Sequence, residues 1–392
     1  MIWIVLLIIA ASLAVDHAAW RRFIAARFSS RRTARICLAA LWATDLLPLI
    51  TVLLYKLLPD NTMAVMSIMS WSMFAFLLLV VPRMAAFAVA LASRRRWIRA
   101  VGIVIAAAIA SVLIGGVTVW RTALEIKSVE IHSDKLPATF DGFRIAVFSD
   151  LHVGALLNPG RETEMVVSKL NSIDADLIVF CGDLVNIRYT ELNACCLSAL
   201  SKLSAPYGVL AVTGNHDTGI YIKNKAALSP DKNMQSLLDM QRYMGWHVLD
   251  DETIHIRRGS DSISISGISF GKSLFDIRHS RNIPDADLTD VYAGTSPDLY
   301  NITLSHLPQL WGQITGLGYG DLTISGHVHA MQAKAQLFGR KISPASLIYD
   351  NWSGLYGDNQ TGYLYINDGI GYVGVPARFG ARPEITLIIL KQ

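Results

Sequence analysis

The first 120 residues contain four apolar windows, each close to the length that a helix needs to cross a bilayer. The windows run from Ile2 to Trp20, Ile36 to Leu58, Met63 to Pro82 and Trp97 to Trp120. A transmembrane helix takes about 20 largely apolar residues. The chain of 392 residues has a mean hydropathy of +0.37 and is 52% apolar, which is too high for an ordinary soluble enzyme. We therefore predict a transmembrane domain of about four helices over residues 1–120.

Arginines are concentrated in two of the three connections between these windows, whereas the second connection has only Lys56 and Asp60. The first connection contains Arg21, Arg22, Arg27, Arg31, Arg32 and Arg35, and the third contains Arg83, Arg94, Arg95, Arg96 and Arg99. Arginine-rich loops stay cytoplasmic. This pattern predicts a multi-pass protein of the cell membrane with everything after Trp120 on the extracytoplasmic side. Because the arginines follow the first window and do not precede it, a cleaved secretory signal is disfavoured.

One acidic residue, Asp45, falls inside the second window. A carboxylate in hydrocarbon is costly and marks a candidate functional site by default. A helix–helix hydrogen bond or an interfacial kink with Pro48 is the favoured interpretation, because a lone acid without a second ionisable partner makes a poor transport pathway.

The net charge of +4 conceals a difference between the two parts of the chain. Residues 1–100 contain 12 Lys and Arg against 3 Asp and Glu, so the remainder contains 23 against 28. This acidic remainder leaves no basic face for nucleic acid. The four cysteines, Cys37, Cys181, Cys195 and Cys196, lack the spacing of a metal site, and free thiols are expected.

Beyond Trp120, short apolar runs alternate with helix-like stretches near 160–172 and 190–203. The runs are Arg144 to Ser149, Asp176 to Cys181 and Tyr207 to Thr213. This alternation is typical of strand–helix–strand units with buried parallel strands. Ligand-forming residues gather beyond the carboxyl ends of such strands. Asp150, Asp183 and Asn215 each follow one run.

Further strands are expected along the rest of the chain, enough for a second sheet in one α/β domain over residues 122–392. They are Ile126 to Ile131 as an edge strand, Ser262 to Ile268, Asn301 to Ser305, Asp321 to Ser325, Gly362 to Ile366, Gly371 to Val375 and Glu384 to Leu390.

Potential metal ligands form a set of short motifs in this domain. The motifs are Asp150-x-His152, Gly182-Asp183, Gly214-Asn215-His216-Asp217, a single His306, and Gly326-His327-x-His329. Residues two apart in an extended segment point to the same side, so each x-spaced pair can hold one ion. The glycines let the backbone turn sharply beside the ligands. The five other histidines, His17, His132, His247, His255 and His279, are interpreted as structural.

The order of these motifs closely resembles the calcineurin-like metallophosphoesterase family, in particular its membrane-attached bacterial branch. The family pattern is D-x-H, G-D, G-N-H-[DE], a lone His and G-H-x-H, and the resemblance covers about residues 124 to 391. It implies a two-sheet β-sandwich flanked by helices in four layers, α-β-β-α. The chain departs from the family at Ala330-Met331, where members often have two glycines.

The resemblance implies a dinuclear centre. One ion is expected on Asp150, His152, Asp183 and His329, and the other on Asp183, Asn215, His306 and His327. Two such ions share a hydroxide, lower its pKa and clamp the phosphoryl oxygens. The resemblance further implies that His216 donates a proton to the leaving oxygen, with Asp217 orienting His216. The nitrogen and oxygen ligand set suits Mn²⁺, Fe or Zn²⁺.

Two arginines near the carboxyl terminus, Arg378 and Arg382, are candidates for binding the substrate phosphate through their bidentate geometry. Surface or inter-loop ion pairing is the competing interpretation of both residues.

The favoured function is that of a membrane-anchored, metal-dependent hydrolase of phosphomonoesters, phosphodiesters or pyrophosphates. The tether beside the bilayer favours a lipid or envelope substrate. A UDP-diacylglucosamine-type pyrophosphohydrolase is an alternative, against which the predicted outward orientation counts, since such nucleotides are cytosolic. A non-enzymatic membrane binding module would show degenerate ligands, and a transporter would show paired intramembrane charges or broken helices.

Overall fold

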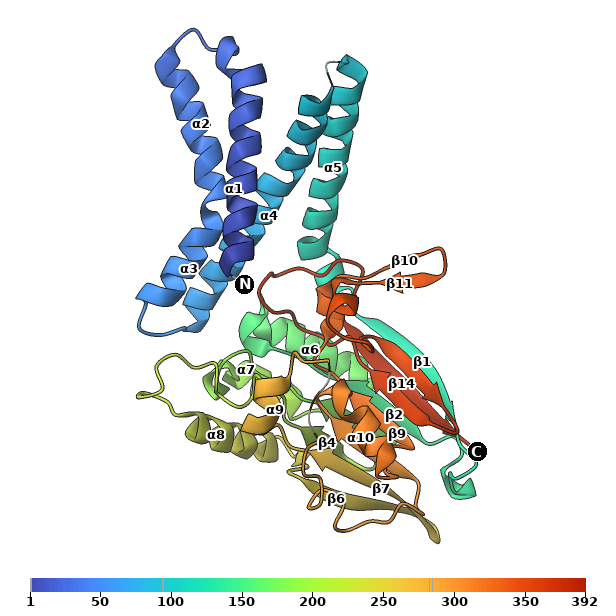
Figure 1. Ribbon diagram of the computed structural model, residues 1–392. Helices are drawn as coiled ribbons and strands as arrows, with labels where there is room; N and C mark the ends of the chain where they lie inside the picture. The colour runs from blue at the N-terminus through green and yellow to red at the C-terminus, as the bar shows by residue number, and fades with distance from the viewer. Residues whose placement is uncertain (1, 94, 282, 284) are drawn as a thin grey trace. The chain divides into compact units, whose positions relative to one another are not determined.

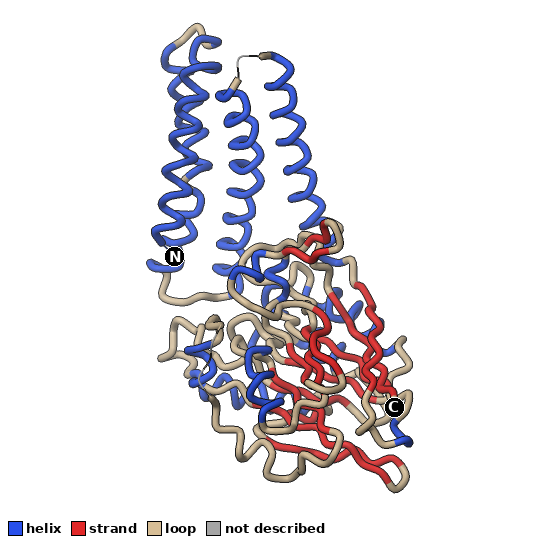
Figure 2. The backbone as a smooth tube through the Cα atoms, turned by 45° about the vertical axis from the view of Figure 1, so that its right-hand side comes forward, coloured by secondary structure: helices blue, strands red, loops and turns tan. Residues whose placement is uncertain are grey.

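The computed structural model describes residues 2–93, 95–281, 283 and 285–392 (Figures 1 and 2). The chain forms two compact units. One contains the helices up to Val119 together with Gly374–Ala377, and the other contains Trp120–Val373 and Arg378–Gln392. The helical unit contains α1 (Ile2–Ala19), α2 (Arg31–Asp45), α3 (Leu47–Leu57), α4 (Met63–Ala92) and α5 (Arg96–Thr118).

Within the part of the chain that the structure describes, two helices are long and apolar enough to cross a membrane, or three spans if a bent pair counts as one, whereas the sequence predicts about four. The helices α4 and α5 qualify singly, and α2 with α3 qualifies only as a pair that is bent by 52°. The bend falls at Leu46, and Pro48 lies in the first turn of α3. Proline is favoured in the first turn of a helix, where its missing N–H would have no partner in any case, so a new helix starts here. The expected second span is therefore broken.

A charged cluster in the helical unit corrects two interpretations of the sequence. Arg83 lies inside α4, not in the connection that follows it. Its Nη2 atom lies 2.7 Å from carboxylate oxygens of both Asp16 and Asp45, and its Nη1 donates to Thr44 at 2.9 Å. Both carboxylates are buried. Asp45 is thus not a lone acid, because α1, α2 and α4 each contribute a charge to one cluster.

The second unit contains two mixed six-stranded sheets. The first has the order β1-β14-β2-β3-β4-β5, and the second has the order β12-β13-β9-β8-β7-β6. The strands of the first sheet are β1 (Glu125–His132), β2 (Arg144–Phe148), β3 (Leu177–Cys181), β4 (Val209–Val212), β5 (His247–Val248) and β14 (Glu384–Lys391). Those of the second are β6 (Glu252–Arg258), β7 (Asp261–Ile268), β8 (Asn301–Ser305), β9 (Leu322–Ser325), β12 (Gly354–Asp358) and β13 (Gly362–Ile366).

Helices and a small hairpin complete this unit. The helices are α6 (Pro159–Asn171), α7 (Ala194–Leu200), α8 (Pro230–Tyr243), α9 (Lys272–Ile277) and α10 (Trp311–Gly316), and the hairpin is β10 (Ala335–Leu337) with β11 (Arg340–Ile342). The strands β2, β3 and β4 are parallel, as the alternation of strands and helices predicts.

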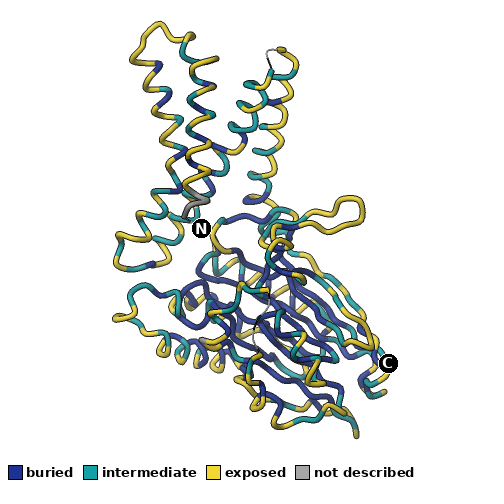
Figure 3. Tube along the Cα trace, in the orientation of Figure 1, coloured by how far each residue is buried: buried dark blue, intermediate teal, exposed yellow. Residues whose placement is uncertain are grey.

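The core of this unit lies against both sheets, whose central strands are mostly dark blue in Figure 3. One apolar cluster contains Val147 and Val179 of the first sheet together with Ile265 and Ile302 of the second. Another contains the opposite face of the first sheet with α6, α7 and α8. These contacts account for strands that are apolar on both faces. The four-layer order stays a prediction.

One expected strand is wrong, and five strands were missed: the short strand β5, the hairpin strands β10 and β11, and the edge strands β6 and β12. The segment from Gly371 to Val375 belongs to no sheet. Its Gly371 N–H donates to the Asp150 carbonyl at 2.7 Å, so the segment lies beside a ligand loop. The missed strands β6 and β12 are largely exposed edge strands with few apolar residues. Apolar runs therefore give no signal for them.

Candidate metal centre

The predicted ligands follow the carboxyl ends of strands in both sheets. Asp150, Asp183 and Asn215 come after β2, β3 and β4, and His306 comes directly after β8. His327 and His329 follow β9. Since neighbouring parallel strands end at the same edge, chain segments that are up to 179 residues apart meet there. The apolar strands position the site, and the loops supply its chemistry.

Four of the predicted ligands form one group. Asp150, His152, Asp183 and His329 each offer one ligand atom, and these atoms lie within 4.8 Å of one another. The two Nε2 atoms of His152 and His329 are 3.2 Å apart, and His329 Nε2 lies 2.8 Å from Asp150 Oδ1. Lone pairs of buried acceptors repel one another unless a cation or a proton lies between them. This group therefore fits a metal ion.

The remaining predicted ligands form a second group around Asp183. His306 Nε2 lies 3.2 Å from Asp183 Oδ2 and 3.2 Å from Asn215 Oδ1. His327 Nδ1 lies 2.9 Å from the same Asn215 oxygen. Asp183 therefore belongs to both groups, and the seven residues singled out from the sequence converge on one buried region.

Backbone carbonyls fix the tautomers of three histidines. The Nδ1–H of His306 donates to the Cys181 carbonyl at 2.7 Å, and the Nε2–H of His327 donates to the Arg278 carbonyl at 3.1 Å. Because a carbonyl only accepts, His306 is left with Nε2 and His327 with Nδ1 as the atom that can bind a metal. In the same way, His216 donates from Nδ1 to the Asn186 carbonyl at 2.6 Å, which leaves its Nε2 free.

Most of the ligand residues have a left-handed backbone conformation, which residues other than glycine rarely adopt. Positive φ angles occur at Asp150 (52°), His152 (44°), Asp183 (62°), His327 (74°) and His329 (49°). Each costs on the order of 1 kcal/mol, and such strain is found where function requires a particular direction of the side chain. Gly182 is also left-handed, with φ 88°, and a Cβ there would lie 2.7 Å from His306 Nδ1.

The pKa values in the site shift toward the protonation states that metal ligands require. Burial lowers the pKa of His327 to about 3, with a further contribution from His306. Burial also lowers the pKa of His152 well below its ordinary value. Burial opposes ionisation of Asp150, but His329 holds its pKa at about 2. Neutral imidazoles and an ionised carboxylate are the forms that bind metals.

His306 is the exception, and it shows that the site attracts positive charge. Burial alone would lower the pKa of His306, but the Asp183 carboxylate beside it raises that pKa to about 9. The proton on this imidazole therefore balances part of the carboxylate charge. A divalent cation between the same groups would balance the charge more fully. The donor set thus fits divalent ions.

Comparison with known proteins identifies the family. The model of the calcineurin-like phosphoesterase family matches residues 143–331. The metallophosphoesterase YkuE of Bacillus subtilis (strain 168) is 30% identical over 307 residues, an alignment that covers 76% of this chain and 98% of YkuE. The chain belongs to the calcineurin-like metallophosphoesterase family.

A second relative of this metallophosphoesterase is named as a transmembrane protein. The bovine (Bos taurus) transmembrane protein with metallophosphoesterase domain is 29% identical over 273 residues, covering 68% of this chain and 57% of the relative. Calcineurin-like phosphoesterases use two divalent metal ions, and the Asp and His cluster described above could hold them. The chain is therefore a metal-dependent phosphoester hydrolase, and membrane association agrees with its apolar helices.

Asp217 has partners in the metallophosphoesterase that differ from those expected. Its carboxylate accepts hydrogen bonds from the backbone N–H groups of Asp183 (2.9 Å), Leu184 (2.9 Å), Val185 (3.2 Å) and Gly214 (2.9 Å). The orienting partner of His216 is instead a carbonyl. Asp217 therefore joins the two loops that supply Asp183 and Asn215. A carboxylate in this motif looks the same in the sequence whichever group it contacts.

The two candidate phosphate-binding arginines differ in exposure. Arg378 is fully buried, and its guanidinium donates to the carbonyls of Gly371 and Asp368 and, at 3.1 Å, of Ala381. With its donors committed to the backbone, it stabilises the C-terminal loop and does not face a substrate. This contradicts the interpretation of Arg378 as a phosphate ligand. Arg382 is exposed, and its predicted role stays a prediction.

No role at the metal centre was predicted for three residues that lie beside it, Tyr221, Arg278 and His279. Tyr221 accepts a hydrogen bond from Asn215 Nδ2 at 3.0 Å, and its ring lies 4.5 Å from that of His216. Arg278 donates to the same Tyr221 hydroxyl at 3.0 Å. His279 is stacked on His327 and bonds to Tyr349 at 3.0 Å. His279 was interpreted as structural because no neighbouring residue in the sequence shares its role.

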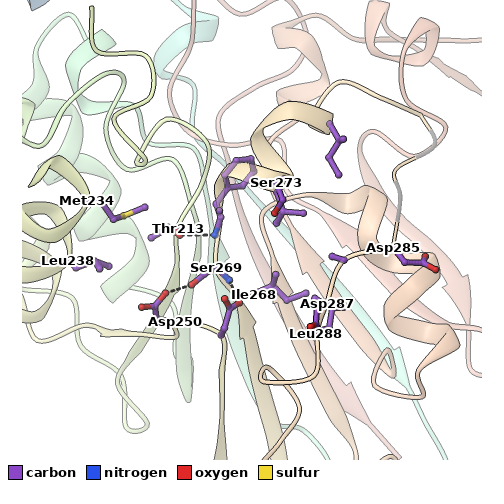
Figure 4. A pocket seen from close by; sticks show the side chains of 16 residues that line it. Thr213, Met234, Leu238, Asp250, Ile268, Ser269, Ser273, Asp285, Asp287 and Leu288 are labelled. Carbon is purple, nitrogen blue, oxygen red and sulfur yellow. Dashed lines mark hydrogen bonds between the residues drawn. The ribbon is translucent and has the colours of Figure 1, made fainter. Parts of the chain in front are cut away.

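A separate cavity of about 540 Å³ lies next to the metal centre (Figure 4). Leu274 and Ile277 of α9 and Met234 and Leu238 of α8 contribute to its lining. Phe270 also lines it, and the Phe270 ring packs edge-on against the His306 ligand at 5.8 Å. The cavity therefore adjoins the support of one ligand without containing any of the seven.

Proposed function

We propose that this chain is a membrane-anchored dinuclear phosphoester hydrolase with its catalytic unit on the extracytoplasmic side. The substrate is a phosphomonoester, phosphodiester or pyrophosphate, drawn from lipids or the envelope. The observation that carries the proposal is the convergence of seven nitrogen and oxygen ligands on two groups that share Asp183. Two groups with a common carboxylate suit two ions and not one.

The ligand sets follow from the two groups. One ion would be held by Asp150, His152, Asp183 and His329, and the other by Asp183, Asn215, His306 and His327. When bound, two divalent ions activate water as a nucleophile at neutral pH and stabilise the charge that develops on the phosphoryl oxygens.

His216 is proposed to provide the proton for the leaving oxygen. Its Nδ1–H is committed to the Asn186 carbonyl, so Nε2 is the atom that exchanges a proton with the substrate. Burial lowers the pKa of His216, which favours the neutral ring in the free protein. A phosphate group bound beside the ring favours the protonated form, so the proton is held when the leaving oxygen needs it.

The central test uses the full chain, purified in detergent and loaded with Mn²⁺. A screen across mono-, di- and pyrophosphate esters, including bis-p-nitrophenyl phosphate, should find metal-dependent hydrolysis. Asp183→Asn should reduce the metal content, whereas His216→Ala should retain both ions and lose turnover. A protein that hydrolyses nothing, and whose metal content is the same with Asn at position 183, would end the proposal.

The proposed orientation has its own test. Positive charge around the first and third connections supports an extracytoplasmic catalytic unit. A reporter enzyme that works only outside the cytoplasm should therefore be active when it is fused to the carboxyl terminus of this chain. A cytoplasmic result would contradict the orientation and favour the alternative of a pyrophosphohydrolase acting on a UDP-linked acylated sugar.

A further inference from the structure

The segment that follows α9 is fastened directly to the metal centre. The Arg278 carbonyl accepts the Nε2–H of the ligand His327 at 3.1 Å. His279, the next residue, stacks on the His327 ring at 5.7 Å and bonds to Tyr349, whose hydroxyl lies 3.3 Å from His327 Nε2. The position of Arg278 is therefore set by contacts with a ligand and not by the surface.

The Arg278 side chain reaches the other ligand of this group through one hydroxyl. Arg278 Nε and Asn215 Nδ2 both donate to the Tyr221 oxygen at 3.0 Å. This contact fixes the Asn215 amide with its nitrogen outward and its oxygen toward His306 and His327. The guanidinium therefore lies one hydroxyl away from a metal ligand.

The same hydroxyl group brings Arg278 close to the proposed proton donor. The Tyr221 ring is tilted by 31° over the His216 imidazole, with the ring centres 4.5 Å apart. The Arg278 guanidinium in turn lies 5.6 Å from the centre of the Tyr221 ring and 3.7 Å from that of Phe275. Aromatic faces hold a guanidinium without neutralising it.

Arg278 has no carboxylate partner among the described residues, although its side chain is half-buried. Two other partly buried arginines are paired with carboxylates, namely Arg83 with Asp16 and Asp45, and Arg121 with Glu162. A partly desolvated cation without a counter-ion, next to a site for phosphoesters, is suited to an anionic ligand. Its Nη1 donates to the Phe275 carbonyl, and its Nη2 has no hydrogen-bond partner within the described part of the chain.

We propose that Arg278 binds a phosphoryl oxygen of the substrate and that Tyr221 positions both this guanidinium and the Asn215 amide. The inference rests on the proposed function, and it narrows the substrate class to phosphate groups that are linked through only one of their oxygens. A phosphomonoester carries about −1.5 to −2 charges at pH 7. A phosphodiester carries a single charge, so an additional guanidinium favours the monoester or the terminal phosphate of a diphosphate.

The first experiment measures binding and does not depend on turnover. Inorganic phosphate is titrated calorimetrically into the Mn²⁺-loaded full chain in detergent. Arg278→Gln should weaken binding by at least about tenfold, as expected for one charge-assisted hydrogen bond. Arg281→Gln is the matched control. Arg281 is exposed and bonds to the Ile348 carbonyl, and its replacement by Gln changes the charge by the same amount as Arg278→Gln. It should alter binding less than about twofold.

The second experiment measures selectivity. Arg278→Gln should lower kcat/KM for p-nitrophenyl phosphate more than for bis-p-nitrophenyl phosphate, and Arg278→Lys should recover part of the loss. Tyr221→Phe should weaken Mn²⁺ binding as well, because the Asn215 amide is freed to turn. An effect on both esters alike, with unchanged phosphate binding, would show that Arg278 only packs against the site.

The outcomes separate the two proposals. Equal phosphate affinity of wild type and Arg278→Gln overturns the role of Arg278 even if the enzyme hydrolyses esters, and so does a wild-type protein that binds no phosphate. Conversely, a wild type that binds phosphate through Arg278 but cleaves no ester retains the subsite and refutes the proposed function.

Discussion

The contacts of Asp217 lead to a prediction that separates two roles for this residue. In Asp217→Asn, one carboxylate oxygen is replaced by an NH₂ group of nearly the same size. In the wild type, each carboxylate oxygen of Asp217 accepts hydrogen bonds from two backbone N–H groups. One oxygen accepts from Leu184 and Val185, and the other accepts from Asp183 and Gly214. Whichever way the amide turns, two buried donors face another donor.

The expected cost follows from this count of lost acceptors. A buried N–H left without a partner costs about 1 to 3 kcal/mol, so two cost about 2 to 6 kcal/mol. Since domains are stable by about 5 to 15 kcal/mol, the variant should remain folded. At roughly 2.5 °C per kcal/mol for a unit of this size, Tm should fall by about 5 to 15 °C. Asp183 should lose its left-handed conformation, and the bound metal should decrease.

The assay compares metal per chain, thermal unfolding and ester hydrolysis in the detergent-solubilised protein. His216→Ala is the control, because it removes the proposed proton donor while the Asp217 carboxylate keeps its four backbone N–H donors. If Asp217→Asn keeps its metal and its Tm within about 1 °C and loses only turnover, as His216→Ala should, the carboxylate acts through His216 and the role derived from its four contacts is refuted.

Three further changes test other parts of the chain. Gly182→Ala should reduce metal content, because its Cβ lies 2.7 Å from His306 Nδ1 in a left-handed conformation; full metal occupancy would contradict this. Arg378→Met should lower the free energy of unfolding by about 2 to 4 kcal/mol without changing KM, and Arg382→Gln is its exposed control; a raised KM in the first would restore the substrate role. Arg83→Met should destabilise the helical unit by about 3 to 5 kcal/mol, measured by thermal unfolding in detergent, because two buried acids lose their cation; an unchanged Tm would show that they are not charged together.

Ligand positions could be predicted from the sequence because their chemistry and their order are local. Asp150 and His152 are two residues apart, and Gly182 precedes Asp183, so each motif can be recognised without knowledge of the fold. The buried strands that lead into the motifs are apolar on both faces and were found for the same reason. Their ends agree with the structure to within about two residues, the usual uncertainty of such boundaries.

Contacts between distant segments could not be predicted in this way. Arg278 and Tyr221 are 57 residues apart, and nothing in either neighbourhood indicates that one hydroxyl joins them. The same holds for Arg83, which is 38 residues from Asp45 and was assigned to a connection because the third apolar window was ended at Pro82. Arg378 failed for the opposite reason. A buried guanidinium that serves backbone carbonyls has the same sequence appearance as one that faces a ligand.

The left-handed ligands have a consequence for any attempt to engineer this protein. The strain of these five residues together lowers the free energy of unfolding by on the order of 5 kcal/mol. A selection for heat resistance in the absence of metal would therefore find its easiest gains at these positions, where glycine or asparagine relaxes the chain. The variants with the highest thermal stability would be inactive, so a useful selection has to require both catalytic activity and thermal stability.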